Sequence, residues 1–280
     1  MFIMVAMPAV GLKSRPRCMY QHWHGTSEGP AMDLHSIGLE ALNGKQVLIT
    51  GGSTGVGRAT ALMFAAAGCR VFICGSNGQH LADAIEAGRQ QGAEIGGIAI
   101  DLRKPDSIEA LFRGADEWLG HIDIAVLNAG IGAHGVLTSM SHEECREVVT
   151  VNLLSYIACS LESIKRMQGR GGQIIMTGSM SAAVADEHAT VYTATKSGVR
   201  GFARSLRKEA NPLGIRVSLV EPGSIGSDMV DETCEQQREM QEALKMLQAE
   251  DVARAIFFLA SQPARCDVIE LQVRPRLQII

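Results

Sequence analysis

Residues 50–57 of the chain read TGGSTGVG, and they directly follow the apolar run QVLI at residues 46–49. Glycines at positions 51, 55 and 57 allow the backbone to turn tightly and to approach a pyrophosphate closely. The helical periodicity that begins at residue 55 brings free N–H groups and the positive end of a helix dipole to the same point. Because the loop lies between a predicted strand and a predicted helix, it predicts a dinucleotide-binding turn. It lacks the Gly-Lys-Ser/Thr ending of a P-loop, so we do not expect nucleoside triphosphate hydrolysis.

Outward from this loop, short apolar runs alternate with helical segments as far as residue 273. The runs are continuously apolar, so each strand should be covered by helices on both faces. Repeated strand–helix units predict one doubly wound parallel sheet, a Rossmann fold of about seven strands in a single α/β domain. A polar, acidic stretch at residues 224–248 breaks the alternation and is a candidate mobile lid. The predicted strands are residues 46–50, 71–74, 98–100, 122–127, 173–177, 216–220 and 268–273. The predicted helices are residues 55–67, 80–91, 106–119, 141–167, 190–210 and 251–260.

The chain of 280 residues and 30.0 kDa has room for one such domain and a short extension. We expect residues 1–40 to be an N-terminal extension, either disordered or upstream of the true start, and residues 41–280 to form the domain. The net charge of −4 gives no support for a nucleic-acid partner. No run of about 20 apolar residues predicts a membrane span. The seven cysteines contain no Cys-x-x-Cys pair, which favours small buried side chains in a reducing compartment, without a metal site.

A second group of residues is typical of chemistry at the sheet edge. Tyr192 and Lys196 are four residues apart, on one face of the helix predicted over residues 190–210. Ser179 lies thirteen residues before Tyr192, just past the strand predicted at residues 173–177. Ligands of parallel sheets collect at the carboxyl ends of the strands, where Ser179, Asn128 and the glycine loop all fall. We therefore expect these three separate elements to meet at one site.

Together these motifs resemble the short-chain dehydrogenase/reductase family over residues 44–275. The spacing of the glycine loop, with three residues between Gly51 and Gly55, matches the cofactor loop of that family. Further matches are Asn128-Ala129-Gly130 after the fourth strand, Asn152 on a helix, the Ser179/Tyr192/Lys196 set, and Pro222-Gly223 after the sixth strand. The resemblance implies an NAD(P)(H)-dependent oxidoreductase that interconverts a carbonyl and an alcohol by hydride transfer.

The resemblance also implies a role for each catalytic residue. Tyr192 would be the general acid/base, and Ser179 would hydrogen-bond the substrate oxygen. Lys196 would bind the nicotinamide ribose and, with the oxidised nicotinamide, lower the pKa of Tyr192 by about 1–3 units. Asn152 would hold a water that relays protons to Lys196. The cofactor contacts implied by position are Gly51, Ser53, Thr54, Gly55, Val56, Gly57, Ser76, Asn77, Asp101, Asn128, Ala129, Gly130, Tyr192, Lys196, Pro222, Gly223, Ile225 and Ser227.

The choice of cofactor depends on the end of the second strand, which reads Cys74-Gly75-Ser76-Asn77. NAD sites usually carry an acidic residue there, which binds the ribose 2′-hydroxyl. No carboxylate is present, and Ser76 and Asn77 could donate to a 2′-phosphate with Arg58 nearby. We therefore favour NADP(H) over NAD(H). The alternative is that Ser76 and Asn77 only form the turn.

We expect a small carbonyl or alcohol substrate, a homodimer or homotetramer, and a cytoplasmic location. The C-terminus lacks an Asp-Gly-Gly ending, which favours the branch of broad-range alcohol dehydrogenases over that of acyl-carrier-protein reductases. Asp186 and Glu187 would disfavour an anionic substrate if they face the mouth of the site. A non-catalytic, NADP(H)-sensing regulatory protein on the same fold is the alternative function. A Rossmann-like methyltransferase would explain the glycine loop but would leave Ser179, Tyr192 and Lys196 without a role.

Overall fold

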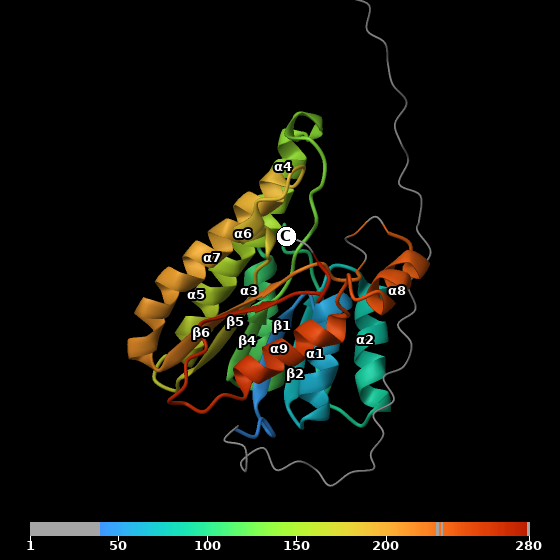
Figure 1. Ribbon diagram of the computed structural model, residues 1–280. Helices are drawn as coiled ribbons and strands as arrows, with labels where there is room; N and C mark the ends of the chain where they lie inside the picture. The colour runs from blue at the N-terminus through green and yellow to red at the C-terminus, as the bar shows by residue number, and fades with distance from the viewer. Residues whose placement is uncertain (1–39, 228–229, 231, 279–280) are drawn as a thin grey trace, which may run out of the picture. The chain divides into compact units, whose positions relative to one another are not determined.

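One sheet of seven parallel strands organises the molecule, in the order β3-β2-β1-β4-β5-β6-β7 (Figure 1). The structure, a computed structural model, describes residues 40–227, 230 and 232–278, and the statements below refer to those residues. The predicted doubly wound parallel fold is confirmed. The strands are β1 Gln46–Thr50, β2 Arg70–Gly75, β3 Ile95–Ala99, β4 Ile124–Leu127, β5 Gly172–Thr177, β6 Ile215–Pro222 and β7 Glu270–Val273.

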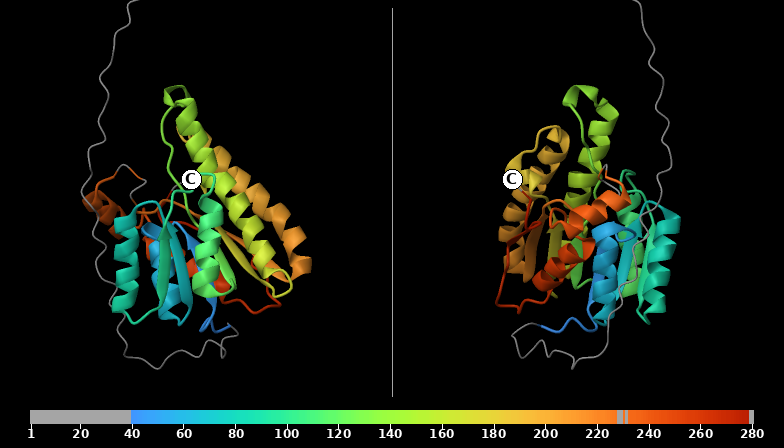
Figure 2. Two further views of the ribbon diagram at one scale, coloured as in Figure 1. Left: turned by 180° about the vertical axis from the view of Figure 1, so that it is seen from behind. Right: turned by 45° about the vertical axis from the view of Figure 1, so that its right-hand side comes forward.

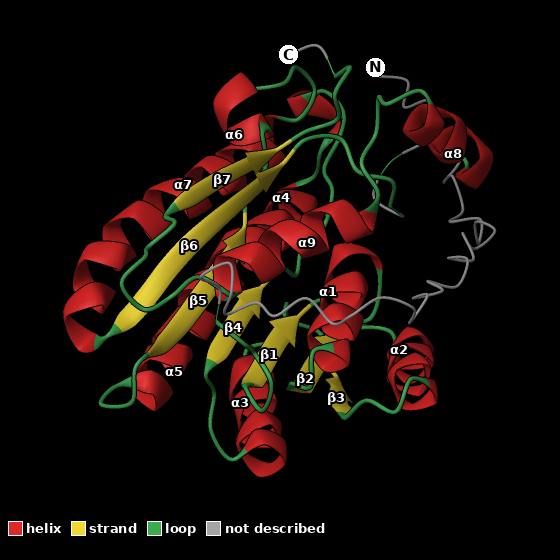
Figure 3. Ribbon diagram, turned by 60° about the horizontal axis from the view of Figure 1, so that its bottom comes forward, coloured by secondary structure: helices red, strands yellow, loops and turns green. Residues whose placement is uncertain are grey.

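Helices cover both faces of this sheet, as the continuously apolar strands predicted (Figure 3). The core on one face joins the sheet to α3, α5 and α7, with Tyr156 among its buried members. The core on the other face joins it to α1, α2 and α9, with Phe64 fully buried. The helices are α1 Gly55–Ala66, α2 Gly78–Gln90, α3 Ser107–Leu119, α4 His142–Val149, α5 Ser155–Met167, α6 Ser181–Val184, α7 Thr190–Ala210, α8 Cys234–Glu242 and α9 Ala249–Ala260.

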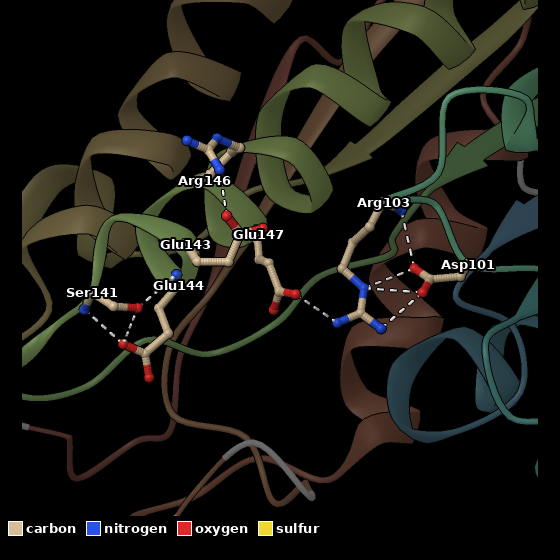
Figure 4. Close-up of polar contacts among 7 residues, drawn as sticks. All are labelled: Asp101, Arg103, Ser141, Glu143, Glu144, Arg146 and Glu147. Carbon is tan, nitrogen blue, oxygen red and sulfur yellow. Dashed lines mark hydrogen bonds and ion pairs between the residues drawn. The ribbon is translucent and has the colours of Figure 1, made fainter.

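The helix predicted over residues 141–167 is interrupted by a π-helical turn at Thr150–Leu154, which joins α4 to α5. The predicted capping box at its start is present, because Ser141 Oγ accepts from Glu144 N at 3.1 Å and the Glu144 carboxylate accepts from Ser141 N at 2.7 Å. This arrangement is visible in Figure 4. Figure 2 shows that α4 projects beyond the carboxyl ends of the strands. The helix pair α4–α5 therefore forms one wall above that edge.

Most element bounds differ by one or two residues from those predicted, and three features differ more. Strand β3 begins at Ile95, earlier than the predicted residue 98. The prediction missed this start because Gly96 and Gly97, which leave space for Trp118 and Ile73, interrupt the apolar run. Residues 224–248 contain α8, whose capping box joins Thr233 and Gln236, so the stretch is partly helical. The short helix α6 was not predicted. Residues 1–39 lie outside the described residues, so the N-terminal boundary stays a prediction.

By length and composition alone, the helical stretch His142–Met167 is apolar enough to cross a membrane. Its inward side chains, such as Tyr156 and Cys159, belong to the core, and the helix of a protein core passes the same test. The finding is therefore weak evidence for a membrane span. In the described part of the chain, no group of three or more histidine, cysteine, aspartate or glutamate side chains is placed to hold a metal ion.

Candidate active site

The strand order changes direction between β1 and β4, and ligands of open α/β sheets bind at such a switch point. Thr50 fixes this point, because its hydroxyl accepts from the backbone N–H of Asn128 at 3.0 Å and of Ala129 at 3.1 Å. Asn128 extends the connection to β5, since its Oδ1 accepts from the Thr177 hydroxyl at 3.2 Å. A cavity of about 560 Å³ lies at this edge, lined by residues that follow the strands.

The glycine loop has the conformation that a close approach to a phosphate needs. Gly51 and Gly55 have φ values of +65° and +51°, which only glycine adopts easily. A Cβ on Gly57 would lie 2.0 Å from the carbonyl oxygen of Gly51, so this glycine lets α1 pack against the loop. Thr54, the N-cap of α1, makes no side-chain bond to the first turn, which leaves its N–H groups to an anion. The loop therefore fits a dinucleotide pyrophosphate.

At the adenosine end of the cavity, Ser76 and Asp101 both lie on the wall. Arg103, also on the wall, binds the Asp101 carboxylate at 2.8 Å and reaches Glu147 of α4 at 3.1 Å (Figure 4). Hydrogen bonds from Arg103 lower the pKa of Asp101 below its ordinary range. Arg103 therefore ties the loop after β3 to α4 on the far wall.

Asn77 has a different position from the predicted one. Its side chain caps α2 and accepts from the backbone N–H of Gln79 at 2.9 Å and of His80 at 3.0 Å. Asn77 and Arg58 are absent from the lining of the cavity among the described residues. Asn77 therefore only forms the turn, which was the alternative to phosphate binding. Ser76 lies on the cavity wall, where it could bind the 2′-phosphate.

Ser179, Tyr192 and Lys196 come together in the cavity, as their spacing predicted. Ser179 lies close enough to Tyr192 to lower the pKa of the phenol, and Ser179 Oγ accepts from the backbone N–H of Ser181 at 3.1 Å. Lys196 is 4% exposed and donates to the carbonyl oxygen of Thr177 at 2.9 Å. Its Nζ lies 5.7 Å from the centre of the Tyr192 ring. The phenol and the ammonium are thus neighbours without a direct hydrogen bond between them.

In the absence of a cofactor, burial is the main influence on the pKa of Tyr192. Burial raises the pKa of this phenol above its ordinary value, the hydrogen bond from Ser179 opposes that effect, and the charge of Asp186 adds to it. Burial also lowers the pKa of Lys196 to about 8, because the ammonium has lost its solvation. Without a cofactor, burial thus favours the protonated phenol, and the lowering expected from Lys196 together with the oxidised nicotinamide stays a prediction.

Asn152 is fully buried in the π-helical turn and grips one residue of the cavity wall. Its Oδ1 accepts from Ile131 N at 2.8 Å, and its Nδ2 donates to Ile131 O at 2.9 Å. Between this amide and the ammonium of Lys196 lies Gly130, whose added Cβ would be 3.5 Å from Asn152 Oδ1 and 3.8 Å from Lys196 Nζ. The side chain of Asn152 thus holds Ile131 by both of its polar atoms, and the predicted water relay at this residue stays a prediction.

The segment after β6 closes the remaining side of the cavity. Pro222, Gly223, Ile225 and Ser227 all lie on its wall. Gln278 lies there as well and accepts from Ser224 N at 3.1 Å. A Cβ on Gly223 would be 2.1 Å from the Gln278 side-chain oxygen, so this glycine admits the C-terminal segment.

Most of the predicted site residues thus line one cavity, and Gly57, Asn77 and Asn152 support it from behind. Sequence reasoning missed Arg103 and Gln278. The imidazole of His134 also lies on the cavity wall, stacked on Tyr192 with ring centres 6.3 Å apart. No local motif marks Arg103 or Gln278, because each reaches the cavity only through the folded loops.

The glycine turn, the switch point and the Ser/Tyr/Lys cluster define a nicotinamide-dinucleotide oxidoreductase on a Rossmann fold. A family model described as short chain dehydrogenase matches residues 45–238, and the chain belongs to this family. It is therefore an NAD(P)(H)-dependent oxidoreductase that interconverts a carbonyl and an alcohol.

Known relatives cover most of the chain. The 3-oxoacyl-(acyl-carrier-protein) reductase FabG of Pseudomonas aeruginosa is 35% identical over 229 residues, which are 80% of this chain and 93% of that protein. FabG of Escherichia coli K12 is 34% identical and covers 79% of this chain and 91% of its own. The crystal structure of a short-chain dehydrogenase from Burkholderia cenocepacia in complex with NADP has a TM-score of 0.76 at 28% identity. That match covers 84% of this chain and 98% of the other.

Proposed function

We propose that Tyr192 is the general acid/base of this oxidoreductase and that Ser179 binds the oxygen of the substrate. The observation that carries the proposal is that both side chains line the cavity at the switch point, with Ser179 close enough to Tyr192 to lower the pKa of the phenol. A carbonyl oxygen of the substrate would then lie between the two hydroxyls. Tyr192 would then protonate the oxygen as it gains charge, and Ser179 would stabilise it.

The other residues hold the reacting groups in position. Lys196 would bind the ribose hydroxyls of the cofactor. Its hydrogen bond to Thr177 O fixes the position of the ammonium group. The π-helical turn at Asn152 would keep Ile131 and Gly130 out of the space that Lys196 needs. The bound nicotinamide supplies or accepts the hydride. Tyr192 and Ser179 supply the polar contacts to the reacting oxygen.

NADP(H) is the cofactor that we infer. Support comes from Ser76, which lies on the cavity wall where an NAD-preferring site would carry a carboxylate. The NADP complexes among the similar structures agree with it. Titration of the protein with NADPH and NADH should give the lower dissociation constant for NADPH. Equal or tighter binding of NADH would refute the preference.

We also propose that the chain forms a homodimer or homotetramer through α5 and α7. Three large apolar side chains, Leu154, Ile157 and Leu161, are 52%, 39% and 55% exposed and share one helix face by their spacing. An exposed apolar stripe of this kind is typical of an interface. The cytoplasmic location stays a prediction, because neither the fold nor the names of the relatives bear on it.

The regulatory alternative gains nothing from the structure, since Ser179, Tyr192 and Lys196 all lie in the cavity. The FabG relatives do not support the branch preference drawn from the C-terminus. The decisive experiment is NADPH oxidation over a panel of ketones and 3-oxoacyl thioesters, with wild type and Tyr192→Phe. We expect the variant to lose at least about 100-fold in kcat while it binds NADPH nearly as well, since one general acid is worth 10²–10⁴-fold. Unchanged turnover in Tyr192→Phe would refute the assignment.

A further inference from the structure

We use the name outer pocket for four residues of the cavity wall, His134, Val184, Asp186 and Val230. The imidazole of His134 stacks on the Tyr192 ring, with ring centres 6.3 Å apart. The two valines make part of its wall apolar. A substrate whose oxygen lies between Ser179 and Tyr192 would therefore place its remaining groups against these residues.

Asp186 is held at this place by the turn between α6 and α7. Ala185 adopts a left-handed conformation with φ of 59°, which ends α6 and directs the chain toward α7. The Asp186 carboxylate then accepts from the Ser181 hydroxyl at 2.7 Å. Within residues 40–227, 230 and 232–278, no lysine, arginine or histidine forms an ion pair with it. Asp186 therefore lines the cavity without a cationic partner among these residues.

The other charged residues of the cavity wall are Asp101, Arg103 and Lys196. Arg103 pairs with Asp101 and with Glu147 of α4. Lys196 is buried, and its ammonium is directed to Thr177 O rather than to the outer pocket. Asp186 is close enough to Tyr192 that its charge raises the pKa of the phenol. A charged group on the substrate would meet the same field.

We propose that Asp186 selects the substrate by charge, so that this enzyme acts on uncharged or positively charged carbonyl compounds and discriminates against anionic ones. The inference rests on the proposed function, because it places the substrate oxygen between Ser179 and Tyr192. Two unit charges a few ångströms apart near a protein surface interact strongly enough to change a rate constant several-fold. Solvent at the rim reduces this effect, so we expect a change of roughly three- to tenfold.

The test uses three acetophenones that differ at the para position: 4-acetylbenzoate, its methyl ester and the 4-trimethylammonio compound. Their intrinsic reactivities differ, so the measured quantity is the change in the ratio of kcat/KM values between wild type and variant, in which those differences cancel. In Asp186→Asn, the ratio of anionic to neutral ketone should rise about three- to tenfold. The ratio of cationic to neutral ketone should fall by a similar factor.

Glu187→Gln is the matched control, because it removes a neighbouring charge that is not on the cavity wall. The Glu187 side chain is 88% exposed and lies 3.6 Å from His188. We expect Glu187→Gln to change both ratios less than about twofold, since exposed charges interact weakly. If Asp186→Asn leaves the ratios unchanged, or if Glu187→Gln shifts them equally, the proposal is wrong.

A binding measurement separates this proposal from the proposed function. The dissociation constants of the three corresponding alcohols, measured with NADPH present, should show the same shift in Asp186→Asn. If the wild type reduces none of the ketones but the alcohols show the shift, the charge selection holds and the catalytic assignment fails. If the ketones are reduced without any charge-dependent shift in rate or binding, only the charge selection fails.

Discussion

The ion pair between Arg200 and Glu221 provides the sharpest test of how the active-site elements are held together. Glu221 is the penultimate residue of β6, directly before Pro222 of the cavity wall, and its side chain is fully buried. Arg200 of α7 binds both of its oxygens, at 2.7 and 2.6 Å, with 16% of its own side chain exposed. Arg200 also donates to Ala182 O of α6 at 3.2 Å. One guanidinium thus joins the helix of Tyr192, the segment after Ser179, and β6.

Replacing Arg200 by methionine would leave the Glu221 carboxylate buried without its cation. Removal of one partner of a buried ion pair typically costs about 3–5 kcal/mol of the free energy of unfolding. For a domain of this size each kcal/mol corresponds to about 2–4 °C, so the Tm should fall by roughly 6–20 °C. We also expect kcat to fall at temperatures well below the transition, because three catalytic elements lose a shared contact.

Arg204→Met is the matched control, one helical turn further along α7. Arg204 pairs with Glu270 at 2.8 Å, but 62% of its side chain is exposed. An exposed pair is worth about 0–1 kcal/mol, so the Tm should fall by at most about 4 °C. The double variant Arg200→Met/Glu221→Gln should recover part of the lost stability, because no unpaired carboxylate remains.

Urea and thermal unfolding at one protein concentration would measure these effects, since oligomer formation makes the Tm depend on concentration. The reasoning fails if Arg200→Met loses no more stability than Arg204→Met. It also fails if adding Glu221→Gln to Arg200→Met lowers the stability further, because the loss would then not come from an unpaired carboxylate.

Two further predictions concern Lys196 and the oligomer. Burial lowers the pKa of Lys196 from 10.5 to about 8. Between pH 8 and 10.5 the folded state therefore binds fewer protons than the unfolded state, because only the exposed lysine of the unfolded state is still protonated. The free energy of unfolding should rise with pH across this range. Lys196→Met should remove this rise and increase the free energy of unfolding by up to about 3 kcal/mol at pH 7, measured by urea unfolding of the cofactor-free protein. The same variant should lose turnover. An unchanged dependence of the free energy of unfolding on pH would contradict the assignment. Leu161→Glu should shift the protein toward a 30 kDa species in size exclusion with light scattering, whereas a wild type that is already monomeric would exclude the proposed interface.

Patterns that depend on local physics were predicted closely from the sequence. The helix predicted at residues 190–210 is observed at Thr190–Ala210, since its buried face recurs with helical periodicity. Strand β1 matches its predicted bounds, because a continuous apolar run followed by a glycine turn has few other structures available. The convergence of Ser179, Asn128 and the glycine loop followed from the rule for the carboxyl ends of parallel strands.

Other features depended on contacts between distant segments. Arg103 joins Asp101 to Glu147, which is 44 residues away, and Gln278 reaches Ser224 across 54 residues. No spacing rule connects such pairs. The role of Asn77 was open for a related reason, since the same residue type caps a helix or binds a phosphate, and only the folded turn decides between them.

The environment of Tyr192 bears on the direction of the reaction. A phenol that donates its proton serves carbonyl reduction, whereas alcohol oxidation needs the phenolate. Burial and Asp186 both favour the protonated phenol, and the hydrogen bond from Ser179 only partly opposes them. Lys196 adds little, because its own charge is destabilised by the same burial. Without a cofactor the site therefore holds the neutral phenol, which is the form that donates a proton in carbonyl reduction.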